Sequence, residues 1–338
     1  MTKILCTLGP SSLNKTTVKA LDKQGVDLFR INLSHAPLDD LEEVLLNLKT
    51  WTDVPICLDS EGAQVRNGSM TSEQTHFKKN DLVKIHANAI VGDEGNISFT
   101  PACVFLALVV GDKIQVDFNS VSFCVVELSK DHLIAEVLES GYVGSNKGTV
   151  VSRPLILPAV TPKDKAAFEL GLAMGIKNYA LSFTHRGSDV ASIREIIGDM
   201  NLISKIESIE GILNIKEILP LVDQILIDRG DLSREIPIAK IPFIQRSLIS
   251  YAKDYDTPVY VATNLLESMI TSFSPTRAEA NDVASTLLMG ASSLVLAAET
   301  AIGKYPVEAV NMLNSIIRQY EHWTPETTFE ELINFERV

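Results

Sequence analysis

The sequence is poor in cysteine, and its four cysteines form no recognisable site. They show no C-x-x-C spacing and have no neighbouring histidine cluster, which argues against a disulfide framework and against a structural zinc site. Each lies among apolar or β-branched residues, and free cysteine is commonly a core residue. We therefore predict buried, unreactive thiols at Cys6, Cys57, Cys103 and Cys124.

Positive charge is also scarce. The 338 residues contain 30 Lys and Arg against 43 Asp and Glu, a formal net charge of −13. General binding to nucleic acid or to anionic lipid needs an excess of basic residues, so neither partner is expected. An anionic substrate would need a local cationic pocket.

Long apolar runs are absent. No stretch approaches the roughly 20 apolar residues of a membrane span. The N-terminal MTKILCTLGPSS has neither the apolar length nor the cleavage site of a signal peptide. We expect a soluble, cytoplasmic protein.

What the chain does contain is a regular alternation of short apolar runs, typical of β-strands, with amphipathic helical stretches. This pattern is typical of parallel strands joined by crossover helices. Thr161 and Pro162 form a helix start, and Ser188 is a second candidate cap. Eight such runs are present, at residues 3–6, 28–31, 55–58, 178–181, 202–206, 224–227, 258–262 and 293–296.

The alternation is interrupted once, at residues 68–152, by a segment rich in β-branched residues and turn pairs that we predict to be a small all-β domain. Subtracting these 85 residues from 338 leaves 253, close to the roughly 250 of a (β/α)8 barrel. We therefore predict an α/β fold, a (β/α)8 TIM barrel formed by residues 1–67 and 153–325, with the β domain inserted after strand three. A doubly wound open sheet is the alternative, but the G-x-G-x-x-G turn it would carry after its first strand is missing.

Polar residues follow the predicted strands, at the end of a barrel where catalytic groups gather. Lys205 and Glu207 are two positions apart, so their side chains point to the same face. A structural ion pair would explain these two alone. Asp231, from the next loop, adds a second carboxylate, and two carboxylates with few other ligands commonly hold Mg²⁺.

Further residues at these ends suggest phosphoryl transfer. Arg30 offers a fork suited to phosphate, Lys205 offers a mobile point charge, and Thr263 adds a hydroxyl. Gly230 permits close approach of backbone to a ligand. Positioning and charge neutralisation by such groups do most of the catalysis in phosphoryl transfer.

A second cluster consists of oxygen donors with one carboxylate. It would suit a monovalent cation, and a hydrogen-bonded cap between two loops is the alternative. His35 beside it has no metal-ligand spacing and is expected at the surface or in a cap. The members of the cluster are Asn32, Ser34, Asp59 and Ser60.

These residues lie within motifs through which the sequence resembles the pyruvate kinase family. The matches keep their order along nearly the whole chain, and PTRAE and ATNLLESM are the most specific of them. The family fold, a (β/α)8 barrel with a small β domain after strand three, agrees with the count above. The motifs occupy residues 2–12, 29–35, 59–66, 144–148, 157–164, 204–208, 228–232, 262–269, 274–284 and 299–310.

The resemblance implies a role for each matching residue. Arg30 would bind the phosphate of phosphoenolpyruvate and Lys205 would stabilise the phosphoryl group in transfer. Gly230 and Thr263 would meet the substrate carboxylate, with Thr263 placed where the enolate is protonated. Further implied assignments are substrate binding by Asp231 and Ser182, Mg²⁺ or Mn²⁺ at Glu207 and Asp231, nucleotide contacts at Arg66, Lys147, His35 and Asn32, and K⁺ at Asn32, Ser34, Asp59 and Ser60. ADP would receive the phosphoryl group, giving pyruvate and ATP in glycolysis.

Several positions depart from the family pattern. Glu61 replaces a lysine, and Gln64 replaces a charged residue tied to monovalent-cation use, which argues against K⁺ dependence. Asp228 stands where a small residue is common, and Ser233 replaces a glycine. The family's usual S-G-E-T reads AAET at 297–300.

The end of the chain is the largest departure. Residues 326–338 are expected to form a short tail instead of the C-terminal regulatory domain, which implies a homo-oligomer other than the usual regulated tetramer. Three alternatives to pyruvate kinase chemistry follow: transfer to another small 2-keto or 2-hydroxy acid, an inactive ligand-binding relative, and an unrelated metal-dependent barrel lyase.

Overall fold

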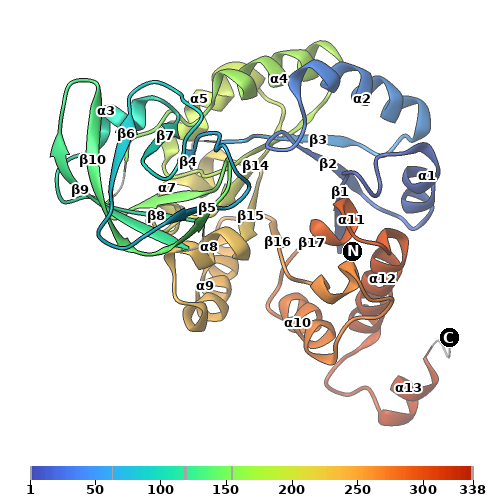
Figure 1. The fold of residues 1–338 in the computed structure, drawn as a ribbon. Coiled ribbons are helices and arrows are strands. Elements are labelled where there is room, and N and C mark those ends of the chain that lie inside the picture. Colours follow the sequence, from blue (N-terminus) through green and yellow to red (C-terminus); the bar gives the residue numbers. More distant parts are fainter. Residues whose placement is uncertain (1, 63, 118–119, 154, 336–338) are drawn as a thin grey trace. The chain divides into compact units, whose positions relative to one another are not determined.

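The computed structural model describes residues 2–62, 64–117, 120–153 and 155–335. The chain forms two compact units, one made of Met1–Gly62 with Val160–Val338 and the other of Ala63–Ala159 (Figure 1).

Eight parallel strands of the first unit close into a barrel, in the order β1, β17, β16, β15, β14, β13, β3, β2. Every predicted run agrees with one of these strands to within one residue at each end. The closed sheet confirms the predicted (β/α)8 barrel and excludes the open, doubly wound sheet. The strands are β1 (Lys3–Thr7), β2 (Leu28–Asn32), β3 (Ile56–Asp59), β13 (Asn178–Leu181), β14 (Asn201–Ile206), β15 (Gln224–Asp228), β16 (Val259–Ala262) and β17 (Ser293–Leu296).

Helices connect the barrel strands and cover them from outside (Figure 1). Three short 3-10 helices add to them: η1 (Leu219–Leu221), η2 (Ile238–Lys240) and η3 (Glu267–Ile270). The α-helices are α1 (Lys15–Lys23), α2 (Leu38–Trp51), α4 (Pro162–Ala173), α5 (Gly187–Ile197), α6 (Ile209–Leu213), α7 (Ile215–Ile218), α8 (Arg229–Glu235), α9 (Ile241–Asp254), α10 (Arg277–Leu288), α11 (Ala298–Ala301) and α12 (Pro306–His322).

Of the two predicted helix starts, one is confirmed. Thr161 caps α4, its hydroxyl oxygen accepting from the backbone of Asp164 while that carboxylate accepts from the Thr161 backbone. The Ser188 cap is wrong: α5 begins at Gly187, and Asp189 bonds the backbone N–H groups of His185 and Arg186 instead. A carboxylate inside the first turn thus satisfies the donors that the serine was expected to satisfy.

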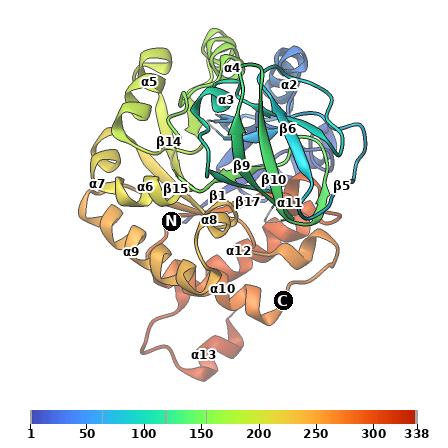
Figure 2. The ribbon, with the colours of Figure 1, turned by 60° about the vertical axis from the view of Figure 1, so that its left-hand side comes forward.

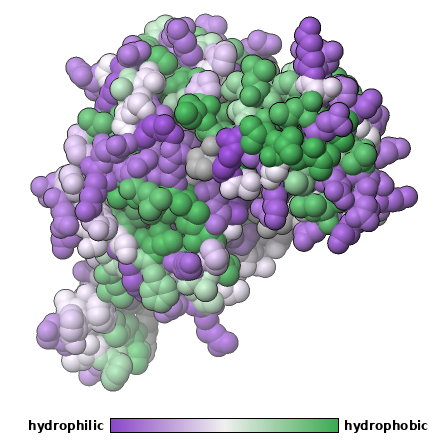
Figure 3. Space-filling model, turned by 90° about the vertical axis from the view of Figure 1, so that its left-hand side faces the viewer, coloured by the Kyte–Doolittle hydropathy of each residue, from purple (hydrophilic) through white to green (hydrophobic). Residues whose placement is uncertain are grey.

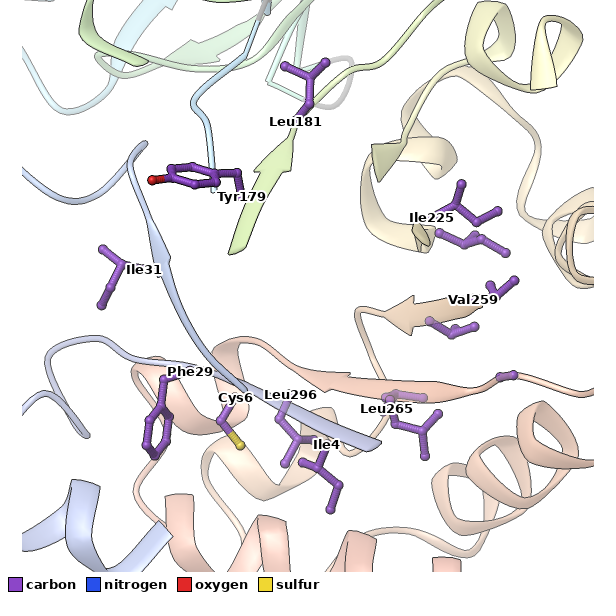
Figure 4. Close-up of a cluster of buried hydrophobic side chains, with 14 of the residues drawn as sticks. Ile4, Cys6, Phe29, Ile31, Tyr179, Leu181, Ile225, Val259, Leu265 and Leu296 are labelled. Atoms are coloured by element: carbon purple, nitrogen blue, oxygen red, sulfur yellow. The ribbon is translucent and has the colours of Figure 1, made fainter. Parts of the chain in front are cut away.

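Each barrel strand divides its side chains between two apolar regions, because successive residues point to opposite faces. Ile225 and Ile227 of β15 pack toward the helices, while Leu226 between them faces the barrel interior. Figure 4 shows members of the outer cluster, such as Phe29 and Leu181, which come from several barrel strands. The inner layer, called the apolar layer below, consists of Leu5, Leu28, Cys57, Ala180, Ile203, Leu226, Tyr260, Ala262 and Val295.

The second unit consists mainly of antiparallel strands around its own apolar core (Figure 2). A seven-stranded sheet runs in the order β12, β8, β9, β10, β6, β7, β4, and β5 pairs with β11. Phe77 and Phe123 meet edge to face in the core, with ring centroids 5.3 Å apart. The strands are β4 (Arg66–Asn67), β5 (Thr75–Phe77), β6 (Leu82–His86), β7 (Asn96–Thr100), β8 (Lys113–Val116), β9 (Val121–Leu128), β10 (His132–Glu139), β11 (Gly141–Val143) and β12 (Thr149–Val151).

Two details of this unit differ from the predicted all-β domain at 68–152. Its described residues contain one helix, α3 (Cys103–Ala107), where the apolar run CVFLA makes a single turn and buries Val104 and Phe105. The unit also begins before residue 68 and ends after residue 152, at Ala63 and Ala159, and β4 near its start pairs with β7.

The predicted burial of the cysteines is only partly correct. Cys6 and Cys57 are buried, Cys124 is partly exposed and Cys103 is exposed. Burial raises the pKa of the Cys6 and Cys57 thiols. Cys103 differs because it begins the one-turn helix α3, where only one side of the helix packs inward.

Outside the two cores, the described residues include a short helix in the predicted tail, α13 (Phe329–Asn334), which Thr328 and Glu331 cap reciprocally. Figure 3 shows hydrophilic side chains over much of one face, with apolar patches between them. Among the residues described, no helix combines the length and apolar character needed to cross a membrane.

Candidate active site

The candidate site begins two residues beyond the apolar layer on the same strands. Leu28 is followed by Arg30 on β2, Cys57 by Asp59 on β3, and Ile203 by Lys205 on β14. The strand period of two therefore keeps these charged side chains inside the barrel, at its carboxyl-terminal end. All three are nearly inaccessible to solvent, at 5%, 0% and 4% exposure.

Asp59 joins the two cations. Its Oδ2 lies 2.7 Å from Arg30 Nε and 3.3 Å from Lys205 Nζ. Lys205 Nζ also lies 2.9 Å from Glu207 Oε1, so the predicted pair of Lys205 and Glu207 is in direct contact. Ser182 Oγ accepts from Lys205 Nζ at 2.9 Å and lies 2.7 Å from the carbonyl oxygen of Ser60. The network is a buried chain of alternating charges.

The charges control the pKa values in this network. Burial alone would lower the pKa of Lys205, but Asp59 and Glu207 raise it above its ordinary value, so the lysine is a permanent cation. Glu207 shows the opposite balance: burial, assisted by the nearby Asp231 and Asp228, outweighs Lys205 and raises its pKa to about 8. A bound cation would compensate this crowding of negative charge.

Three carboxylates crowd together beside Lys205. Glu207, Asp228 and Asp231 each offer an oxygen within 4.8 Å of the others, and we call them the acidic triad. Glu207 is oriented by the backbone N–H of Phe183, which donates to its Oε2 at 2.7 Å. Asp231 Oδ1 lies 3.1 Å from Arg234 Nε. The structure thus brings together the two predicted metal ligands and adds Asp228 to them.

Asp228 accepts hydrogen bonds from the loops that follow β15 and β16. Its Oδ1 accepts from Thr263 Oγ1 at 2.6 Å, from the Gly230 backbone at 3.1 Å and from the Asp231 backbone at 3.4 Å. Burial alone would raise the pKa of Asp228, but the charge of Lys205 and the Thr263 hydrogen bond hold it below the usual value.

Gly230 and Thr263 approach each other too closely for a larger residue. A Cβ at Gly230 would lie 2.7 Å from Thr263 Cγ2, so glycine is required there. Thr263 itself adopts a left-handed backbone with φ of 74°, which is rare for a β-branched residue. Arg229 holds it there, donating from Nη2 to the Thr263 carbonyl oxygen at 2.6 Å while its Nη1 contacts Asp282 at 2.6 Å.

The second predicted cluster is hydrogen-bonded within the protein. Asn32 Oδ1 accepts from the Ser34 backbone at 3.0 Å, and Ser60 Oγ accepts from the Ser182 backbone at 2.8 Å. Asp59, the only charged member, already contacts two cations. These hydrogen bonds agree with the alternative, a cap between two loops, but each oxygen keeps a further lone pair, so the monovalent-cation site stays a prediction.

The predicted nucleotide-binding residues belong to both units. In the second unit, Arg66 Nη1 donates to the Asn146 carbonyl oxygen at 2.9 Å, and Lys147 Nζ lies 3.6 Å from Asp117. In the first unit, His35 is exposed and its backbone N–H donates to Asn32 at 3.1 Å.

Two further buried carboxylates near the strand ends accept hydrogen bonds from the backbone of neighbouring loops. Glu299 accepts from the backbone of Leu266 at 3.1 Å and of Ala297 at 2.9 Å. Asp164 accepts from the backbone of Glu61 at 2.7 Å and so fixes the loop after β3. The position of Asp164 three residues after Thr161 predicts its capping role, but not its bond to Glu61.

Sequence reasoning missed three contributors to the site. Arg229 lies within the motif at residues 228–232 but was given no role, although it holds Thr263. Phe183 orients Glu207 through its backbone, with φ of 51°, and no residue type signals this. Asp228 was noted only as a departure from the family pattern.

Buried cations beside an acidic triad, at the carboxyl ends of a closed parallel barrel, define a (β/α)8-barrel protein with a polar site suited to an anionic ligand. Residues 1–310 match the family model described as pyruvate kinase, barrel domain. The chain belongs to the pyruvate kinase family, and this membership supports a transferase enzyme of pyruvate kinase-like function.

Curated relatives agree over most of the chain. A pyruvate kinase of Mycobacterium tuberculosis is 35% identical over 327 residues, covering 93% of this chain and 69% of the relative. The pyruvate kinase of Thermotoga maritima is 32% identical over 330 residues, covering 95% and 71%. That of Geobacillus stearothermophilus is 35% identical over 333 residues, covering 95% of this chain and 57% of the relative.

Proposed function

We propose that this chain transfers a phosphoryl group from phosphoenolpyruvate to ADP, giving pyruvate and ATP in cytoplasmic glycolysis. The observation that carries the proposal is the acidic triad within 4.8 Å, in contact with Lys205 through Glu207. A negative cluster paired with buried cations suits a reaction in which a charged phosphoryl group passes between partners.

Mg²⁺, or Mn²⁺ in its place, fits the chemistry of the donors. Three carboxylates supply the hard oxygen ligands that these ions prefer, and Glu207 and Asp231 would hold the ion. Such an ion neutralises phosphate charge when bound. Burial, with Asp231 and Asp228 nearby, raises the pKa of Glu207, and a bound cation would favour its charged form. K⁺ at Asn32, Ser34, Asp59 and Ser60 stays a prediction, and no step of the proposal depends on it.

The positions of the cationic residues support the roles proposed for them. Arg30 Nη1 is buried and has no hydrogen-bond partner among the described residues, so it can donate to a phosphate oxygen. Lys205, a permanent cation held by Asp59 and Ser182, would stabilise the charge of the phosphoryl group in transfer. Thr263 would position a proton at the substrate through its hydroxyl.

The remaining predicted residues complete the proposal. Ser182 would act through Lys205, whose ammonium it orients. Asp231 and Gly230 would lie next to the small acid. The nucleotide contacts are proposed for each unit by itself, Asn32 and His35 in the first and Arg66 and Lys147 in the second.

The test is pyruvate formation from phosphoenolpyruvate, ADP and Mg²⁺ by the purified protein. Lys205→Met should lower turnover by at least about a thousandfold, because a charge that acts mainly in the transition state is lost. Lys165→Met is the matched control, since the Lys165 side chain is exposed and its ammonium lies 4.0 Å from Glu169. Absence of pyruvate formation by folded wild-type protein would refute the proposal.

A second candidate is phosphoryl transfer involving another small 2-keto or 2-hydroxy acid. It is favoured by Asp228, whose carboxylate bonds the donors that a substrate carboxylate would use. A panel of such acids with ATP and Mg²⁺ separates the two, and activity confined to phosphoenolpyruvate would reject this candidate.

A further inference from the structure

We infer that Asp228 is a specificity-determining residue whose carboxylate competes with the substrate carboxylate for the donors on Gly230, Asp231 and Thr263. The inference rests on the proposed function, which places a small acid at these groups. Its consequence is that the wild-type chain binds a 2-keto acid more weakly than a variant without this side chain.

The competition is for the same hydrogen atoms. Two backbone N–H groups and one hydroxyl all donate to a single oxygen, Asp228 Oδ1. Each N–H has one hydrogen to give, and a charge-assisted bond to a carboxylate is stronger than one to a neutral acceptor. An incoming carboxylate therefore has to displace an equivalent group that is covalently held in place.

The donors have little freedom to serve both acceptors. The Gly230 backbone is packed against Thr263, where even a Cβ would clash at 2.7 Å. Arg229 fixes the Thr263 carbonyl with two nitrogens and is itself fixed by Asp282. Because the loop is held from both sides, the donors stay directed at the position that Asp228 Oδ1 fills.

Charge adds to the competition. Asp228 is buried, at 8% exposure, and shares the acidic triad with Glu207 and Asp231. A substrate carboxylate at these donors would be the fourth negative group in a small volume, and like charges at short range in a poorly solvated site repel strongly.

The experiment measures binding of pyruvate, a carboxylate without a phosphoryl group, by calorimetry at saturating Mg²⁺. Asp228→Ala should bind pyruvate at least about tenfold more tightly than wild type, which corresponds to about 1.4 kcal/mol. Asp223→Ala is the matched control. It removes a carboxylate beside the opposite end of β15, one that pairs with Arg194 at 2.8 Å, and should leave the pyruvate affinity unchanged.

Asp228→Asn provides a second variant that keeps the size and the acceptor oxygen while removing the charge. It should bind pyruvate more tightly than wild type but less tightly than Asp228→Ala. If the alanine variant does not fold, the comparison of Asp228→Asn with wild type tests the inference by itself. In steady state, the KM for phosphoenolpyruvate should fall in both variants while the KM for ADP stays within about twofold.

The outcomes separate this inference from the proposed function. Tighter pyruvate binding by Asp228→Ala without turnover by any variant would support the inference and refute phosphoenolpyruvate as the donor. Turnover by wild type with the same pyruvate affinity in both Asp228 variants, or with weaker affinity, overturns the inference alone. Failure of every protein to bind pyruvate also overturns it, because the freed donors would then not receive a carboxylate.

Discussion

Two layers inside the barrel are built by the same strands and differ in what holds them together. The apolar layer contains Leu28, Ile203 and Leu226, each from a different strand. Two residues further along those strands lie Arg30, Lys205 and Asp228, which together with Asp59 and Glu207 we call the charged layer. One step of the strand period thus separates a region held by apolar burial from one held by ion pairs.

The difference shows why the site is placed at one end only. Apolar side chains lose nothing when packed away from water, whereas each buried charge needs a partner. In the charged layer Asp59 pairs with two cations, and Glu207 pairs with one of them. A layer that is stable only through such pairing can exchange a partner for a ligand, which a packed apolar layer cannot do.

The largest effect on the charged layer is expected from removal of Asp59, the carboxylate that Arg30 and Lys205 share. Asp59→Ala should lower the free energy of unfolding by about 3–5 kcal/mol, because Arg30 Nε and Lys205 Nζ lose a carboxylate at 2.7 and 3.3 Å. Urea denaturation of the variant and of wild type measures this. A loss below about 1 kcal/mol would mean that the ion pairs contribute little to the charged layer.

A smaller effect is expected from a conservative substitution in the apolar layer. Ile203→Val in the apolar layer should cost about 0.5–1.5 kcal/mol, the usual effect of removing one buried methylene. It should leave the KM for phosphoenolpyruvate within about twofold, since only packing below the site changes. A KM shift as large as that of a charged-layer variant would show that the two layers do not act separately.

A buried-charge network can also be compared with a carboxylate at the surface of the same unit. Glu279 completes the capping box of α10 with Thr276, accepting from the backbone of Ser268 at 2.6 Å and of Thr276 at 2.7 Å. Burial alone would raise its pKa, but the hydrogen bonds from Ser268 and Thr276 outweigh burial and lower it. Glu279→Gln should therefore cost about 1 kcal/mol at pH 7, the typical value of a cap.

The lowered pKa of Glu279 decides in which direction pH changes the stability difference between wild type and Glu279→Gln. A carboxylate with a lowered pKa stabilises the fold fully above its unfolded value of about 4.3, and this stabilisation is lost as pH falls through the folded value. The difference between wild type and Glu279→Gln should be smaller at pH 4 than at pH 7 in urea denaturation. An equal difference at both pH values would contradict the assignment.

The smallest effect concerns monovalent cations. Replacing K⁺ by tetramethylammonium at constant ionic strength should change turnover by less than about twofold, because Asp59 already contacts Arg30 and Lys205. Loss of most activity without K⁺ would support the predicted K⁺ site at Asn32, Ser34, Asp59 and Ser60.

The strands and the pairing of Lys205 with Glu207 were predictable because they depend on neighbouring residues. Apolar runs of four or five residues identified every barrel strand, and a separation of two positions placed the lysine and the carboxylate on one face. The Ser188 cap and the burial of Cys103 were wrong for a related reason. A cap and a buried face each depend on which partner is near, and Asp189 and the single turn of α3 decided those cases.

The sequence by itself determined the eight strands, the motifs of the pyruvate kinase family and the residue types that gather at the strand ends. Only the tertiary structure decided that Asp59 contacts both Arg30 and Lys205, although Lys205 follows Asp59 by 146 positions. It also decided that Asp228 bonds Thr263, which follows it by 35 positions. The physical reason is that strand periodicity is local, whereas the partner of a buried charge is fixed by closure of the barrel, which brings distant strand ends within a few ångströms of one another.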